Sequence, residues 1–454
     1  MRAFLTILVF LAASFAFAEP PDLGTRHTGS DWPRFLGPTA DSISTETGII
    51  KPWPKDGLKV VWQKKLSLGY APPAVSRGRL FVFDSYIDAE KKQILARLTC
   101  RNAETGAELW KFEYPTDYDD FFGYDNGPRC SPIVDGDHVF ILGVEGMLHC
   151  LRAVDGKEVW KVDTRQEFNV IQNFFGVASC PVVEGDLLLV AVGGSPKETV
   201  IKDFANDFMG LKSNGSAIVA FDKQTGKVKY RGGDELSGYS TPVVTTVAGQ
   251  RIGLYFARGG LLEFNPQTGE QKFHYPWRAR ILESVNASNP LVVGDKVLLT
   301  ECYGPGSVCL KIKPGGADVI WSDENKDRRE KSLQGHWNTP IHRDGFVYGC
   351  SGRHTAQAEL RCIELATGKL MWRKPGLTRS SLLLVDGHIV CLCEDGLLLL
   401  LRASPDQYQE VSRIDLNEAG LLDYPCWAAP VLSHGLLYLR GKERLVCLEL
   451  IPKK

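Results

Sequence analysis

A short phrase recurs along the chain and constrains its fold more than any other feature. Its clearest copy, residues 148–160, holds an apolar run from Leu148, the pair Asp155-Gly156, and Val159-Trp160 at its end. Such a pair between two apolar runs predicts a tight β-hairpin, because glycine adopts a positive φ without a Cβ clash. Further copies, most of them with Thr-Gly at the turn, span residues 98–110, 218–230, 261–273, 308–321, 360–372 and 398–411.

A second phrase precedes each hairpin and begins with a proline, which we call the phrase proline. Its clearest copies start at Pro132, Pro181, Pro290 and Pro340 and continue with apolar residues and a turn that contains glycine. Looser copies start at Pro73, Pro242, Leu383 and Pro430. Proline is tolerated at the first residue of a strand, where its missing N–H breaks no ladder bond. Each repeat is therefore predicted to be four short strands, and most repeats are roughly 40 to 50 residues long, which is the period of a β-propeller blade.

The eight proline phrases predict an all-β, eight-bladed propeller of four-stranded antiparallel blades over residues 59–454. The last repeat ends at Leu450 without its fourth strand, whereas the segment Lys59–Lys65 has the character of a strand and no blade of its own. We therefore expect the N-terminal strand to complete the C-terminal blade. This closure joins the two ends of the ring and leaves no exposed edge there.

The Thr-Gly and Trp phrase resembles the pyrroloquinoline quinone (PQQ)-type propeller repeat. Asp31–Pro38, which reads Asp-Trp-Pro-Arg-Phe-Leu-Gly-Pro, is similar to the leader of secreted PQQ-like propeller proteins. The resemblance covers residues 59–454 and implies one of two functions. The repeat builds quinoprotein alcohol dehydrogenases, which use PQQ with Ca²⁺, and it also builds the outer-membrane assembly lipoprotein of the β-barrel machinery, which binds no cofactor. The repeat specifies an architecture and leaves the chemistry open.

Residues 1–18 have the pattern of a secretory signal peptide, with Arg2, an apolar run and small residues before Glu19. We expect the mature protein to be periplasmic or secreted, without a membrane span, and monomeric. Residues 19–58 are rich in Pro and Gly and are predicted to be an irregular N-terminal arm along the surface. The formal net charge of −1 gives no electrostatic footprint for nucleic acid, so that class of partner is disfavoured.

Five of the twelve cysteines occupy one position of the repeat, where another copy has alanine. A site that accepts Cys or Ala is a small buried core site, so we expect these five to be reduced packing residues. They are Cys100, Cys150, Cys309, Cys362 and Cys447. Three others lie near strand starts and are the better candidates for disulfides, namely Cys130, Cys180 and Cys426.

A candidate ligand site follows from the topology of a propeller. Loops that enter the innermost strands, and turns between the second and third strands, meet at one mouth of the channel. Cationic and aromatic residues at these positions are predicted to converge there and to bind a ligand: Arg129, Arg258, His336, Trp337, Arg353, His354, Arg379 and Trp427. Convergent arginines favour an anionic or planar carboxylated ligand. The insertion at 193–216 is expected to form an ordered cap over one face.

Two functions remain open on the sequence. The first is a non-catalytic binding or scaffolding module for a protein, peptide, glycan or small anionic ligand. The second is a PQQ- and Ca²⁺-dependent dehydrogenase, in which Glu283, Glu301 or Asp125 would be the candidate base. Nothing singles out one of these three, and the adjacent cysteines typical of quinoprotein dehydrogenases are absent from the sequence. The spacing of Asp117, Asp119, Asp120 and Asp125 matches no calcium loop. We therefore favour binding over catalysis, and predict no resident metal.

Overall fold

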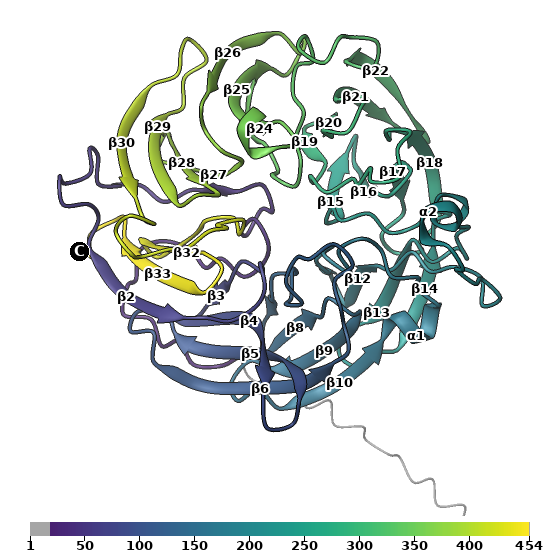
Figure 1. The fold of residues 1–454 in the computed structure, drawn as a ribbon, viewed down its shortest axis with the longest axis horizontal. Coiled ribbons are helices and arrows are strands. Elements are labelled where there is room, and N and C mark those ends of the chain that lie inside the picture. Colours follow the sequence, from purple (N-terminus) through teal and green to yellow (C-terminus); the bar gives the residue numbers. More distant parts are fainter. Residues whose placement is uncertain (1–18, 454) are drawn as a thin grey trace, which may run out of the picture.

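A computed structural model describes residues 19–453, and the predicted signal peptide, residues 1–18, lies outside these described residues. Eight sheets surround a central axis, as Figure 1 shows, so the predicted eight-bladed propeller is confirmed. Within the described part of the chain, no helix is long and apolar enough to cross a membrane.

The blades follow one another in chain order, and the strands of each blade run from the channel outward. Blade 1 holds β3 (Ala74–Ser76), β4 (Arg79–Asp88), β5 (Gln93–Asn102) and β6 (Glu108–Thr116); blade 2 holds β7 (Ile133–Asp135), β8 (His138–Leu142), β9 (Met147–Arg152) and β10 (Glu158–Asp163); blade 3 holds β11 (Val182–Glu184), β12 (Leu187–Ala191), β13 (Ile218–Asp222) and β14 (Val228–Gly232); blade 4 holds β15 (Val243–Val247), β16 (Gln250–Phe256), β17 (Gly260–Phe264) and β18 (Gln271–Pro276).

The second half of the ring repeats the pattern. Blade 5 holds β19 (Leu291–Val293), β20 (Lys296–Thr300), β21 (Ser307–Lys313) and β22 (Gly316–Ser322); blade 6 holds β23 (Ile341–Arg343), β24 (Phe346–Ser351), β25 (Glu359–Glu364) and β26 (Leu370–Pro375); blade 7 holds β27 (Ser380–Val385), β28 (His388–Cys393), β29 (Leu397–Arg402) and β30 (Glu410–Asp415); blade 8 holds β31 (Val431–Ser433), β32 (Leu436–Arg440) and β33 (Arg444–Glu449). Short helices occur in the loops: α1 (Thr164–Phe168), α2 (Phe204–Asp207), η1 (Phe208–Gly210) and η2 (Thr355–Gln357).

The N-terminal strand closes the ring as predicted. β2 (Val60–Lys65) pairs antiparallel with β33, and this pairing places Val60 opposite Leu448 and Trp62 opposite Cys447. Blade 8 therefore takes its fourth strand from the other end of the chain. We call this β2–β33 pairing the closure seam, and the ring opens there only when the two ends of the chain separate.

The recurring tryptophan explains why the phrase repeats. Trp110 on the outer strand of blade 1 donates from Nε1 to the carbonyl oxygen of Ala153 in blade 2, at 3.2 Å. A Cβ on Gly156 of that same turn would lie 2.4 Å from the Trp110 ring, so the glycine turn is a docking surface for the indole. Equivalent indole bonds to the next blade are made by Trp62, Trp160, Trp321 and Trp372. The phrase therefore specifies contacts between blades as well as hairpins.

All twelve cysteines, which lie within the described part of the chain, are buried free thiols. The five at the shared repeat position have no exposed surface, which agrees with the packing role expected of them. Of the three predicted disulfide candidates, Cys426 contacts the carbonyl oxygen of Asp423, whereas Cys130 and Cys180 lie against one another at the junction of blades 2 and 3.

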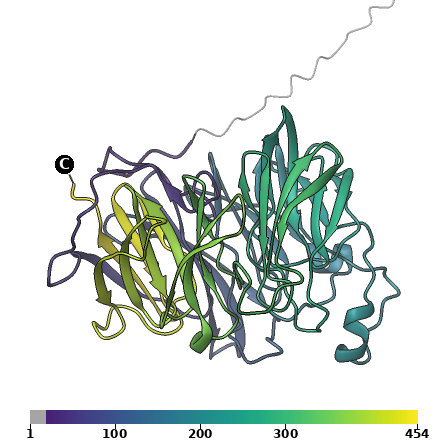
Figure 2. The same cartoon turned by 90° about the horizontal axis from the view of Figure 1, so that it is seen from above.

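The N-terminal arm runs deeper than the surface course that its composition predicts. β1 (Ile43–Ser44) adds a parallel strand to β27 at the inner edge of blade 7. Trp32 is only 1% exposed and pairs with Val75 of β3. Elsewhere the arm bonds to turns between first and second strands, for example at Arg77. Such turns lie at the opposite end of a blade from the predicted mouth, so the arm closes the far end of the channel. Figure 2 shows the arm and α2 on opposite faces of the ring.

Candidate functional site

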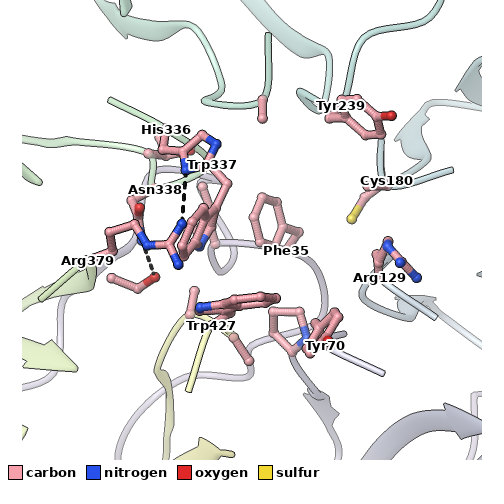
Figure 3. Close-up of a pocket in the computed structure, with 18 of the residues that line it drawn as sticks. Phe35, Tyr70, Arg129, Cys180, Tyr239, His336, Trp337, Asn338, Arg379 and Trp427 are labelled. Carbon is pink, nitrogen blue, oxygen red and sulfur yellow. Dashed lines mark hydrogen bonds between the residues drawn. The ribbon is translucent and has the colours of Figure 1, made fainter. Parts of the chain in front are cut away.

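A pocket of about 200 Å³ lies at the centre of the ring, where the loops that enter the innermost strands meet. Phe35 and Leu36 of the arm lie at one end of it. Aromatic rings from six different loops form much of its wall, as Figure 3 shows in part: Tyr70, Tyr124, Phe175, Tyr239, Trp337 and Trp427. The pocket is therefore a channel closed at one end and lined mainly by apolar surface.

The structure brings together most of the residues that the sequence singled out. Five of the eight line the pocket: Arg129, His336, Trp337, Arg379 and Trp427. Arg353 lies beside them, since its carbonyl oxygen is 3.4 Å from Nη1 of Arg379 and its guanidinium lies over the ring of Tyr303. His354 is exposed next to Arg353.

Arg258 lies apart from this group, in a small buried space under the insertion. Its Nη2 donates to the carbonyl oxygen of Phe208, and its guanidinium carbon is 3.7 Å from the centre of the Phe208 ring. Burial lowers the pKa of Arg258 to about 10, assisted by the charge of Arg278. The insertion, which contains α2 and η1, therefore forms a cap over Arg258 through Phe208, whereas none of its residues is among those that line the central pocket.

Arg379 is the centre of a dense contact network. Its Nε and Nη2 donate to the two carboxylate oxygens of Glu394 at 3.0 and 2.7 Å, and Nε1 of Trp427 donates to the same carboxylate at 2.7 Å. The guanidinium also lies over the ring of Trp337, at 4.5 Å. Burial would raise the pKa of Glu394, but the bonds from Arg379 and Trp427 outweigh it and hold this pKa below its ordinary value. The carboxylate therefore neutralises Arg379 and orients the indole of Trp427.

Arg129 is neutralised in the same way. Its Nη2 forms an ion pair with Asp120 at 3.0 Å, and both side chains are almost fully buried. The guanidinium lies near the rings of Tyr70 and Tyr118. Two of the predicted arginines are thus already paired with carboxylates, so the mouth is less positive than their number suggests, and the remaining character of the wall is aromatic.

His336 is held in its neutral form. Its Nε2 is 2.8 Å from the hydroxyl oxygen of Tyr303, and its Nδ1 is 3.5 Å from Nη1 of Arg379. Burial, followed by the charges of Arg379 and Arg353, lowers the pKa of His336 to about 3. At neutral pH this imidazole therefore adds polar atoms to the wall and no charge.

Two buried polar atoms in the wall lack a partner within the described structure. They are Nε1 of Trp337, a donor, and Oδ1 of Asn338, an acceptor, whose Nδ2 donates to Ser381. Both residues line the pocket. Because a buried polar group without a partner is costly, a ligand that offers one acceptor and one donor would be favoured here.

Several pocket residues were missed by the sequence analysis, among them Phe35, Tyr70 and Phe175. A signal for some of them exists in the repeat. In seven blades the third residue before the phrase proline lines the pocket: Tyr70, Arg129, Ala178, Tyr239, Ala287, Trp337 and Trp427. That position would have found Tyr70, whereas Phe35 lies in the arm, outside any repeat.

The residues at the pocket do not fit a PQQ and Ca²⁺ site. Four carboxylates near the pocket are already engaged: Glu394 and Asp120 by arginines, Asp125 by the backbone N–H groups of Gly69 and Gly127, and Glu301 by three backbone N–H groups. Glu283 is not among the residues that line the pocket. Across residues 19–453, no group of three or more His, Cys, Asp or Glu side chains is arranged to hold a metal ion. Calcium requires a set of free oxygen ligands, which this wall does not offer.

Comparison with known proteins places the chain among PQQ-like propellers. A family model described as outer membrane protein assembly factor BamB matches residues 96–374. The outer membrane protein assembly factor BamB of Burkholderia pseudomallei (strain K96243) is 25% identical over 263 residues, which are 57% of this chain and 59% of that protein. The match thus spans less than two thirds of that relative's length.

Solved structures agree on the fold. BamB from Moraxella catarrhalis matches with a TM-score of 0.58 at 14% identity, covering 86% of this chain and 97% of that one. The quinohemoprotein alcohol dehydrogenase ADHIIG from Pseudomonas putida HK5 matches with a TM-score of 0.60 at 13% identity, covering 94% and 81%. At these identities the likeness concerns the architecture alone, which a binding protein and an oxidoreductase share.

Proposed function

We propose a function from the premise that this chain belongs to the family described as outer membrane protein assembly factor BamB. The protein is a non-catalytic, extracytoplasmic propeller scaffold that acts as a monomer. It binds an extended segment of a partner protein at the central pocket, and an aromatic or large aliphatic side chain of that segment enters between Trp337, Trp427 and Tyr70.

The aromatic wall with neutralised arginines is the observation that carries this proposal. Trp427 lies 5.4 Å from Trp337 and 4.7 Å from Tyr70, measured between ring centres, so the three rings form one continuous surface. Aromatic pairs at such distances favour the entry of a further apolar group. The carboxylates of Glu394 and Asp120 leave little net positive charge to attract a free anion.

The two unpartnered polar atoms favour a peptide over a purely apolar ligand. A peptide backbone presents one C=O and one N–H for each residue other than proline. The first would accept from Nε1 of Trp337, and the second would donate to Oδ1 of Asn338. The family premise agrees with a protein partner, since the matched family and the one matched relative are named as an outer membrane protein assembly factor.

The quinoprotein alternative has no comparable support. It would require free oxygen ligands for Ca²⁺ and a base, and the carboxylates near the pocket are engaged in ion pairs or backbone bonds.

Fluorescence anisotropy with labelled, end-capped hexapeptides tests the proposal. We expect peptides with a central Phe or Leu to bind in a saturable manner, and peptides with a central Glu to bind at least tenfold more weakly. Trp337→Ala should weaken Phe-peptide binding about tenfold or more, since burial of a large side chain is worth about 1.5–3 kcal/mol. Leu370→Ala, on the exposed outer strand β26, is the matched control and should bind normally.

The competing outcomes are distinct. Preferred binding of Glu peptides would contradict the proposal and restore the anionic ligand expected from the sequence. Saturable displacement of the peptide by PQQ with Ca²⁺, lost in Trp337→Ala, would favour the quinoprotein alternative.

A further inference from the structure

Two thiols meet where blades 2 and 3 enter the channel. Cys130 lies two residues before the phrase proline of blade 2, and Cys180 lies directly before that of blade 3. The two side chains lie against one another. The backbone N–H of Ser131 donates to Sγ of Cys180 at 3.3 Å, and Sγ of Cys130 donates to the carbonyl oxygen of Ser179 at 3.4 Å. The pair therefore joins neighbouring blades.

The same junction is built without sulfur in the blades that follow. The residue directly before the phrase proline donates its backbone N–H to the side chain at the same position in the next blade. Cys180 donates to Oγ1 of Thr241 at 3.1 Å, Thr241 to Oδ1 of Asn289 at 2.7 Å, and Asn289 to Oγ1 of Thr339 at 3.1 Å. An oxygen acceptor thus satisfies this position in three successive junctions. The sulfur at Cys180 is not required by the architecture, and a second thiol lies against it.

The pocket gives access to one of the two thiols. Cys180 lines the pocket, and Figure 3 shows its sulfur directed toward the centre. Cys130 has no exposed surface and is not among the residues that line the pocket. Among the cysteines of the described chain, Cys180 is the one that lines this pocket. A small reagent that enters from solvent would therefore meet Cys180 first.

The hydrogen bonds assign different roles to the two sulfurs. Cys180 accepts from the N–H of Ser131 and lies against the thiol of Cys130, and the contact with Cys130, followed by the bond from Ser131, lowers the pKa of Cys180 although burial opposes this. Burial, followed by the contact with Cys180, raises the pKa of Cys130. Because the thiolate is the nucleophile in thiol chemistry, Cys180 is the attacking sulfur and Cys130 the one that resolves the intermediate.

We propose that Cys180 and Cys130 form a thiol–disulfide exchange site on the wall of the pocket, whose co-reactant is a small disulfide-bearing compound. The thiolate of Cys180 attacks one sulfur of the compound, so that a mixed disulfide forms and one thiolate leaves. Cys130 then loses its proton and attacks Sγ of Cys180, which expels the second thiolate. The two protein thiols are oxidised by two electrons in total, and the external disulfide is reduced to two thiols. The site does not depend on the peptide binding proposed above.

Another close pair of cysteines does not offer the same chemistry. Cys391 and Cys393 are alternate residues of β28, and both belong to the core between blades 6 and 7. Contact with Cys391, followed by burial, raises the pKa of Cys393, but neither residue lines the pocket, so a reagent that enters the pocket does not meet their thiols. They serve as an internal control for non-specific oxidation.

Counting thiols in the full-length protein tests the proposal. The reduced protein is incubated with 2-hydroxyethyl disulfide, then denatured and alkylated without reduction. We expect the number of alkylated cysteines to fall from twelve to ten, with a peptide cross-link between Cys130 and Cys180. The melting temperature should rise by roughly 4 °C, because the bond closes a loop of about 50 residues in a chain of this size.

Two variants separate the roles of the sulfurs. Cys130→Ser should stop at a mixed disulfide on Cys180, which mass spectrometry detects directly. Cys180→Thr installs the hydroxyl that Thr241 and Thr339 use at this position, so the variant should fold, and all eleven of its thiols should remain alkylatable. Retention of twelve thiols in the wild type, a link that maps to Cys391 or Cys393, or equal thiol loss in Cys180→Thr would each overturn the proposal.

Discussion

Replacing the turn glycine of one hairpin tests whether the repeat phrase is a docking element between blades. Gly156 has a φ of 72°, and a Cβ built on it would lie 2.4 Å from Cε3 of Trp110 in blade 1. Gly136, in the other turn of the same end of blade 2, has a φ of 59° and nothing within 4 Å of its Cβ position. Gly156→Ala and Gly136→Ala therefore share the backbone cost and differ in the contact with the tryptophan.

The expected difference follows from three contributions. Placing alanine in the left-handed region costs about 1–2 kcal/mol in both variants. In Gly156→Ala the indole must also move, and overpacking of this kind costs about 1–3 kcal/mol. Its displacement weakens the bond from Trp110 to the carbonyl of Ala153, which is worth about 1 kcal/mol. We expect Gly156→Ala to lower the free energy of unfolding by about 2–4 kcal/mol more than Gly136→Ala does.

Urea unfolding followed by circular dichroism measures both variants. A double-mutant comparison isolates the contact: in a Trp110→Ala background the ring is gone, so Gly156→Ala should cost no more than Gly136→Ala. Equal unfolding midpoints for the two single variants, in the presence of Trp110, would refute the docking role of the phrase.

Three further predictions concern charged groups. Arg379→Ala should lower the free energy of unfolding by about 3–5 kcal/mol, because the buried carboxylate of Glu394, which is 1% exposed, then loses its guanidinium partner. Arg353→Ala should change the melting temperature only slightly, since Arg353 contacts a tyrosine ring and has no carboxylate partner among the described residues. A third concerns pH at the closure seam, where the hydrogen bond to Asp31 raises the pKa of His434 above 6.5, and the reciprocal bond lowers the pKa of Asp31 below 3.8 although burial opposes it. The ion pair therefore contributes its full stabilisation between pH 3.8 and 6.5 and loses it as the pH rises through the raised pKa of His434. The loss of unfolding free energy caused by His434→Gln should thus be largest at about pH 5 and shrink by about pH 8. A loss that stays constant over this range would contradict the ion pair.

The fold could be predicted because each element of the repeat has a separate physical role. The Asp-Gly or Thr-Gly pair sets a hairpin, the proline starts an inner strand, and the tryptophan joins one blade to the next. The incomplete last repeat and the orphan segment at Val60 together predicted the closure that β2 makes. The arm was less predictable, because Trp32 and Phe35 lie outside any repeat and their burial depends on contacts with distant strands.

The candidate site could be predicted in position more than in chemistry. The phase of the repeat places Trp337, Arg379 and Trp427 at one end of the ring whatever their side chains are. It carries no information on which carboxylate lies beside which arginine. Glu394 follows Arg379 by fifteen residues, and the two meet only because a turn of blade 7 lies beside the loop that enters it. The expectation of a positive mouth was drawn from arginines counted without these partners.

The wall of the pocket can vary between blades because a different residue holds the blades together. The residue directly before the phrase proline donates its backbone N–H to the side chain at the same position in the next blade, as Thr241 does to Asn289. The residue two positions earlier lines the pocket and takes no part in those bonds, so it can be Trp427 in one blade and Ala178 in another without loosening the ring. Large rings therefore occupy this position in four blades, at Tyr70, Tyr239, Trp337 and Trp427, whereas Ala178 and Ala287 occupy it in two others. It follows that substitutions at this position should change which side chain the pocket accepts far more than they change the melting temperature, unless the residue, like Arg129, also carries a buried ion pair.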